Sequence, residues 1–140
     1  MKTSTQTAEQ PGQSPLASPV FYDVTLRDGN QALAKPLSPE QKLMVFGWLK
    51  ALGVKHVEVG YPAASAMDFA ACRAIAEQAP ADMTIAVLAR GNETDVDTAV
   101  SALRHVKLAT PRLHTFIGMS ELHMANVLGK SPDQVRDMAV

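Results

Sequence analysis

The stretch around which this chain is organised is Asp23-Val24-Thr25-Leu26-Arg27-Asp28-Gly29-Asn30-Gln31. An apolar-leaning run, residues 20–26, has the composition of a β-strand and stops at a charged pair followed by a glycine. Because Arg27 and Asp28 are adjacent, their side chains leave the strand end in different directions and could hold different parts of one ligand, such as an oxyanion and a metal ion. A charged pair beside a surface turn is the alternative interpretation of the same spacing.

Composition limits the class of protein. The chain has 140 residues, 46% of them hydrophobic, which suffices for one domain with a core. Its formal net charge of -1 gives no electrostatic footprint for nucleic acid or an anionic membrane. A single cysteine, Cys72, excludes an intrachain disulfide, and no apolar run approaches the roughly 20 residues of a membrane span. We therefore expect a cytoplasmic protein with a disordered tail over residues 1–18, which are poor in large aliphatic side chains, and a folded domain over residues 19–140.

Strand and helix patterns alternate along this domain, with a repeat near 30 residues. Strands are expected over residues 20–26, 54–60, 83–89 and 112–118, and helices over residues 38–52, 65–80 and 94–107, with another helix beginning at Ser131. Such alternation predicts an α/β fold with right-handed crossovers and a parallel sheet. Since a (β/α)8 barrel takes about 250 residues, the expected fold is a partial barrel containing about the first four βα units. A flavodoxin-like or Rossmann sheet competes, but no Gly-x-Gly-x-x-Gly follows any strand.

The polar residues of the expected strands share one face. Side chains alternate along a strand, and the catalytic groups of parallel barrels collect at the carboxyl ends of several strands. The inner face is expected to carry Asp23, Thr25 and Arg27 from the first strand, His56, Glu58 and Gly60 from the second, and Arg112, His114 and Phe116 from the fourth, with Arg90 just beyond the third.

Ionisable side chains on an interior face are costly unless they pair, form hydrogen bonds or bind a metal. This grouping therefore indicates an anionic ligand and a cation. Alternatives stay open for three residues. His56 lies midway along its strand, which favours a hydrogen-bonded position in the core or on the bottom face of the barrel. Glu58 could be the ion-pair partner of Arg112, and His123 fits a surface position as well as a functional one.

The run Tyr22 to Leu33 resembles the signature of the metal-dependent barrel family that contains 2-isopropylmalate synthase, homocitrate synthase, citramalate synthase and hydroxymethylglutaryl-CoA lyase, a pyruvate carboxyltransferase-like catalytic domain. Residues 57–62, 87–90 and 114–120 resemble the second, third and fourth strands of that family, in its order. Asn30 to Leu33, together with the strand that begins at His114, resembles the 2-isopropylmalate synthase branch best.

The resemblance implies an acyltransferase of leucine biosynthesis that condenses acetyl-CoA with a 2-oxo acid, 3-methyl-2-oxobutanoate. It implies a divalent metal (Mg, Mn or Zn) on Asp28, catalytic roles for Arg27 and Glu58, and a substrate pocket lined by Arg27, Gln31, Arg90 and His114. It also implies small-molecule partners and a homodimer in the full-length enzyme. The family takes two further metal ligands from a His-x-His pair, which this sequence lacks, its histidines being His56, His105, His114 and His123. We expect that pair in a missing barrel half; the other hypotheses are a homocitrate synthase-like, citramalate synthase-like or lyase-like enzyme, or a non-catalytic half-barrel that binds a partner.

Overall fold

The computed structural model describes residues 19–139, so the predicted tail over residues 1–18 lies outside the described residues. Four strands form one parallel sheet in the order β1-β2-β3-β4, so each strand pairs with the next one along the chain. The strands are β1 (Tyr22–Asp23), β2 (His56–Glu58), β3 (Thr84–Arg90) and β4 (Thr110–Phe116). The expected parallel α/β architecture of a partial barrel is confirmed.

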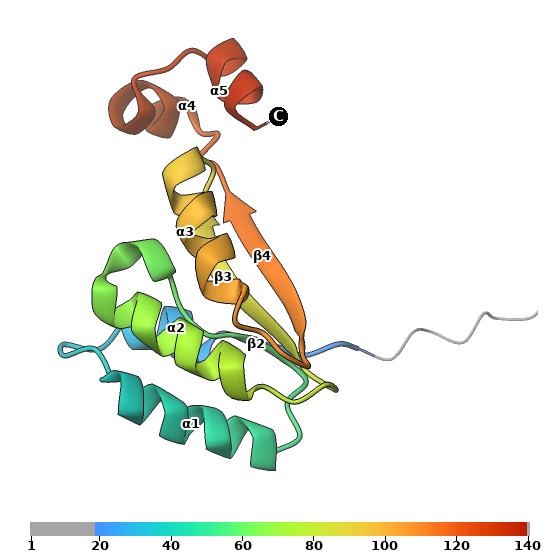
Figure 1. Cartoon of the computed structure of the whole chain (residues 1–140). Coiled ribbons are helices and arrows are strands. Elements are labelled where there is room, and N and C mark those ends of the chain that lie inside the picture. The colour runs from blue at the N-terminus through green and yellow to red at the C-terminus, as the bar shows by residue number, and fades with distance from the viewer. Residues whose placement is uncertain (1–18, 140) are drawn as a thin grey trace, which may run out of the picture.

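The helices connecting these strands cover one face of the sheet (Figure 1). They are α1 (Pro39–Ala51), α2 (Ala66–Gln78) and α3 (Glu93–Leu103), with a short 3₁₀ turn at Pro62–Ala64. Beyond the end of β4 follow α4 (Glu121–His123), a π-helical turn at Met124–Leu128 and α5 (Pro132–Met138). No helix within residues 19–139 is long and apolar enough to span a membrane.

Local capping explains where the helices begin. Ser38 forms a complete capping box with Gln41 at the start of α1, and Ser131 does the same with Gln134 at α5. Ser65 accepts a hydrogen bond from the Asp68 amide at the start of α2, as its sequence spacing predicts. The helix expected over residues 94–107 ends earlier, at Leu103, because i→i−3 hydrogen bonds close its last turn.

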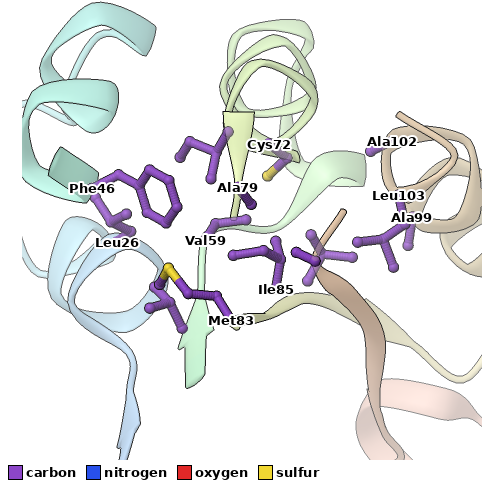
Figure 2. Close-up of a cluster of buried hydrophobic side chains, with 14 of the residues drawn as sticks. Leu26, Phe46, Val59, Cys72, Ala79, Met83, Ile85, Ala99, Ala102 and Leu103 are labelled. Carbon is purple, nitrogen blue, oxygen red and sulfur yellow. The ribbon is translucent and has the colours of Figure 1, made fainter. Parts of the chain in front are cut away.

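The core lies between the sheet and these three helices (Figure 2). Phe46 of α1 and Ile75 of α2 pack against the outward residues of β2 and β3. Cys72 is buried in the same cluster, as the helical spacing of Phe69, Cys72, Ile75 and Ala76 predicts. The cluster includes Leu26, Phe46, Val57, Val59, Cys72, Ile75, Met83, Ile85, Val87, Ala99 and Leu103.

The apolar positions of the helix over residues 38–52 leave a narrow polar edge near Lys42 and Lys50, but Lys42 departs from that pattern. Its side chain is only 1% exposed, and its Nζ forms an ion pair with Asp68 Oδ1 of α2. The second carboxylate oxygen of Asp68 accepts the Tyr61 amide at 2.7 Å. A Cβ on Gly60 would lie 2.6 Å from the sulfur of Cys72 and 3.3 Å from Lys42 Nζ, so this approach requires glycine.

The first strand is also shorter than predicted. It ends at Asp23, and Thr25–Gly29 forms a π-helical turn in which the amides of Arg27, Asp28 and Gly29 all donate to the Val24 carbonyl, at 3.1, 2.8 and 3.2 Å. The Asp23 carboxylate accepts both the amide and the hydroxyl of Thr25 at 3.0 Å, a local arrangement that competes with strand pairing.

The inner face predicted for the first strand is wrong, because the register between β1 and β2 gives the opposite parity. Tyr22 is the register partner of His56, and partners in parallel strands share a face, so Tyr22 points inward and Asp23 pairs with outward-facing Val57. Arg27 still reaches the inner face, but it does so from the turn.

Candidate functional site at the carboxyl ends of the strands

Glu58 joins three elements at the mouth of the sheet. It is the last residue of β2, it is 0% exposed, and its two oxygens are both engaged. Oε2 accepts Arg27 Nε at 2.8 Å, and Oε1 lies 2.6 Å from His114 Nδ1 of β4. Glu58 therefore pairs with Arg27 and His114 rather than with Arg112, the alternative left open by the sequence. A carboxylate accepts hydrogen bonds, so His114 Nδ1 carries the proton and Nε2 is the ring nitrogen left without a partner among residues 19–139.

The Arg27 guanidinium is held from two sides. Its Nε donates to Glu58 Oε2, and its Nη1 donates to Asp28 Oδ1 at 2.5 Å. Asp28 differs sharply from Glu58 in environment, since its side chain is 64% exposed. A guanidinium carries five N–H donors in a rigid plane, so fixing Nε and Nη1 also fixes the direction of the remaining N–H groups, including those of Nη2.

A cleft of about 410 Å³ opens beside this pair. The four residues predicted to bind substrate all line it. They are Arg27 from the turn at Thr25–Gly29, Gln31 just after that turn, Arg90 at the end of β3 and His114 of β4. Neither Asp28 nor Glu58 is among the described lining residues. The lining residues are Arg27, Gln31, Tyr61, Leu88, Arg90, His114 and Phe116. The structure thus brings the four together, while their individual roles remain predictions.

A second carboxylate, Asp95, was not recognised as a site residue from the sequence. It is buried in the first turn of α3 and accepts Arg90 Nε at 2.8 Å, Arg90 Nη2 at 2.9 Å, the Arg90 amide at 3.2 Å and the Tyr61 hydroxyl. The Arg90 guanidinium holds the pKa of the Asp95 carboxyl well below its usual range. Burial, followed by the hydrogen bond to Asp95, raises the pKa of Tyr61 to about 12.

An acidic residue in the first turn of a helix is favoured by the helix dipole. The position of Asp95 therefore needed no further explanation, and the pattern provided no reason to assign it to a site. The spacing of Asn92 and Asp95 could have helped to locate Asp95. The Asn92 side chain caps the helix by accepting the Asp95 amide at 3.0 Å, which places Asp95 in the first turn after β3.

Three more polar residues occupy distinct positions. Tyr22, missed as an inward residue, has its pKa raised to about 12 by burial and then by the negative charge of Glu58. His56 is half-buried with a buried Nδ1 that has no hydrogen-bond partner within residues 19–139, and it does not line the cleft. His123 packs against Gly118, where a Cβ would lie 2.2 Å from its ring, so it too stands apart from the cleft.

The fit of a divalent metal ion follows from the available donors. Asp28 offers an exposed carboxylate, but within residues 19–139 no three His, Cys, Asp or Glu side chains gather as a metal site. Tight binding of Mg²⁺, Mn²⁺ or Zn²⁺ needs several protein ligands at fixed geometry. The described residues therefore do not fit such an ion by themselves.

The fold and the site together define a parallel α/β barrel domain whose polar groups meet at the carboxyl ends of its strands. The chain belongs to the HMGL-like family, whose model matches residues 18–140. It is 44% identical over 121 residues to the 2-isopropylmalate synthase of Nitrosomonas europaea and 44% identical over 121 residues to that of Heliobacterium modesticaldum. It is 45% identical over 120 residues to that of Chromobacterium violaceum. Each match covers 86% of this chain and 23% of the relative, so the chain spans about a quarter of the length of these curated relatives.

Proposed function

We propose that this chain supplies the 2-oxo acid side of an acyltransferase site that condenses acetyl-CoA with 3-methyl-2-oxobutanoate to give 2-isopropylmalate, a step of leucine biosynthesis. The observation that carries the proposal is the cleft itself, where two guanidinium groups, an amide and an imidazole surround one space. The guanidinium and amide donors of this set suit a small anion that also bears a carbonyl oxygen. The similarity to enzymes named 2-isopropylmalate synthase supports the choice of substrate.

In the proposed reaction, the methyl group of acetyl-CoA loses a proton and its carbon forms a bond to the keto carbon of the 2-oxo acid. The keto oxygen gains negative charge and is then protonated, and water hydrolyses the thioester to release CoA. The N–H groups that Arg27 has left after binding Glu58 and Asp28 donate to the keto oxygen and stabilise that charge. Their direction is set in advance, which avoids reorganisation during the reaction.

Glu58 acts in this scheme through Arg27 and His114. Both of its oxygens are occupied and its side chain is inaccessible, so it keeps the guanidinium and the imidazole oriented toward the cleft. The Gln31 amide then donates a hydrogen bond to the bound acid, while His114 Nε2, the ring nitrogen without the proton, faces the same cleft as a hydrogen-bond acceptor. Asp28 is proposed as one ligand of a divalent ion that needs further ligands beyond the described residues, and no step above depends on that ion.

The test is a chimera in which residues 19–140 replace the matching segment of the Nitrosomonas europaea enzyme, assayed for thiol release from acetyl-CoA with several 2-oxo acids. We expect turnover with 3-methyl-2-oxobutanoate, and loss of about 100-fold or more in kcat/KM for Arg27→Gln, the scale seen when a charge-stabilising donor is removed. Arg73→Gln is the matched control, because Arg73 pairs with Glu77 on the surface of α2. Preference for 2-oxoglutarate or pyruvate would reassign the substrate, and a folded but inactive chimera would support the non-catalytic half-barrel instead. For the metal ligand, Asp28→Asn should weaken Mn²⁺ binding by the chimera in calorimetry.

A further inference from the structure

Arg90 is exposed, but its guanidinium is bonded to a buried carboxylate, that of Asp95. Its side chain is 60% exposed, while the Asp95 side chain that binds it is 3% exposed. Exposed ion pairs ordinarily contribute little to stability, and burying a carboxylate costs free energy unless it is fully hydrogen-bonded. Asp95 meets that condition with four donors, three of them from Arg90 and the fourth from Tyr61.

The result of this arrangement is a guanidinium with one fixed orientation. Asp95 takes the Nε donor and one Nη2 donor, so the guanidinium, which has five N–H donors, keeps donors beyond those that Asp95 occupies. The Tyr61 ring stacks beside the same group, with Arg90 Cζ 5.9 Å from the ring centroid. Arg90 and Tyr61 both line the cleft that Arg27 lines.

Tyr61 is itself anchored from behind. Its amide donates to Asp68, and Asp68 pairs with the buried Lys42. A continuous set of contacts therefore runs from α1 through α2 and the end of β2 to Asp95, and it ends at the Arg90 guanidinium, which lines the cleft.

We propose that Asp95 and Tyr61 are positioning residues that hold the Arg90 guanidinium at the cleft, where it binds the carboxylate of the 2-oxo acid. This inference rests on the proposed function, which places the keto oxygen at Arg27. An arginine and a carboxylate form charge-assisted, often bidentate hydrogen bonds, and a fixed guanidinium forms them without losing side-chain entropy. A phosphate of CoA has related chemistry, so the experiment separates the two sources.

The experiment uses the 140-residue chain, with NMR of the Arg90 Nε–Hε group and titration with 3-methyl-2-oxobutanoate, its uncharged analogue 3-methyl-2-butanone, and CoA. In the unliganded chain, the Arg90 Nε–H should exchange slowly with solvent because it is bonded to Asp95, and Asp95→Asn should abolish this slow exchange. The same substitution should weaken binding of the oxo acid about tenfold or more and leave binding of the ketone unchanged. Tyr61→Phe, which keeps the ring and removes one of the four donors, should give a smaller loss for the oxo acid. Asp82→Asn is the matched control, since Asp82 pairs with Lys55 in an exposed position.

Three results would overturn the inference. The first is an Arg90 Nε–H unchanged by Asp95→Asn, and the second is an equal loss of affinity for the acid and the ketone, which a purely structural role predicts. The third is a loss confined to CoA, which would assign Arg90 to a phosphate. If Asp95→Asn does not fold, Tyr61→Phe decides by the same comparison. If Asp95→Asn changes the Arg90 Nε–H exchange as expected but the unsubstituted chain does not bind the oxo acid, the assigned ligand is refuted. The proposed function is tested separately, because an inactive chimera refutes it.

Discussion

Lys42 and Asp68 offer the sharpest test of how the site is supported, because one partner is buried far more completely than the other. The Lys42 side chain is 1% exposed and that of Asp68 is 16% exposed. Removing either partner leaves the other charge uncompensated, and the penalty grows with burial. Asp68→Asn should therefore cost more stability than Lys42→Met.

The expected magnitudes follow from the environment of the remaining group. After Asp68→Asn, the Lys42 ammonium stays in the core with only an amide oxygen beside it, at a cost of about 3–5 kcal/mol. After Lys42→Met, Asp68 keeps the Tyr61 amide and contact with water, so the loss should be about 1–2 kcal/mol. In the double variant neither charge remains, and the loss should be clearly smaller than the sum of the two single losses.

Urea unfolding followed by far-UV circular dichroism at one fixed protein concentration measures all three variants. A loss of 3–5 kcal/mol lowers Tm by about 12–20 °C for a domain of this size. Lys55→Met and Asp82→Asn form the control pair, because that ion pair is exposed on both sides and should contribute far less to stability than the buried pair. Additive effects of Lys42→Met and Asp68→Asn, or an Asp68→Asn variant within about 0.5 kcal/mol of the parent chain, would refute the reasoning.

Three further predictions concern the same core and mouth. Gly60→Ala should destabilise the fold by about 2 kcal/mol or more, because the new Cβ would lie 2.6 Å from the Cys72 sulfur. Gly47→Ala in α1 should instead stabilise the fold by up to about 1 kcal/mol, because no atom lies within 4 Å of its Cβ and alanine favours the helix. Equal Tm values for the two variants would contradict this. Glu58→Gln should lower the free energy of unfolding by about 2–3 kcal/mol because it weakens the hydrogen bonds to Arg27 and His114. Glu77→Gln on the surface should change it far less, and a similar change in both variants would show that burial of Glu58 does not matter. Burial raises the pKa of the Cys72 thiol from 9.0 to about 12, so the folded state binds more protons than the unfolded state between these values, and stability that is complete below pH 9 should be lost as the pH rises toward 12. Urea midpoints from pH 8 to pH 11 test this, with Cys72→Ala expected to show a shallower decline and a flat profile for the parent chain counting against it.

Local patterns predicted much of the fold because their causes are local. The Ser38 and Ser65 caps act within one turn of chain, so their sequence spacing suffices to place the starts of α1 and α2. The two-residue period of β2 and β4 placed Glu58 and His114 on the same face, and the structure joins them at 2.6 Å.

Where prediction failed, a contact that the pattern does not encode was responsible. Lys42 has the spacing of a polar helix edge, and only the presence of Asp68, 26 residues away, allows its burial. Asp95 has a sufficient local explanation at a helix start, which hid its bond to Tyr61, 34 residues distant. For the first strand, Val24 and Leu26 continue an alternation that the Asp23 side chain interrupts by binding Thr25.

The turn at Thr25–Gly29 has a consequence for protein engineering. Its shape is fixed by three backbone amides that share the Val24 carbonyl, and the side chains at positions 27 and 28 contribute none of those bonds. Other residues could therefore be placed at position 28, which is exposed, without changing the course of the backbone, whereas Arg27 is tied to the buried Glu58. At position 28 the turn separates scaffold from chemistry, and a library varied there alone would sample new ligand preferences at a constant main-chain geometry.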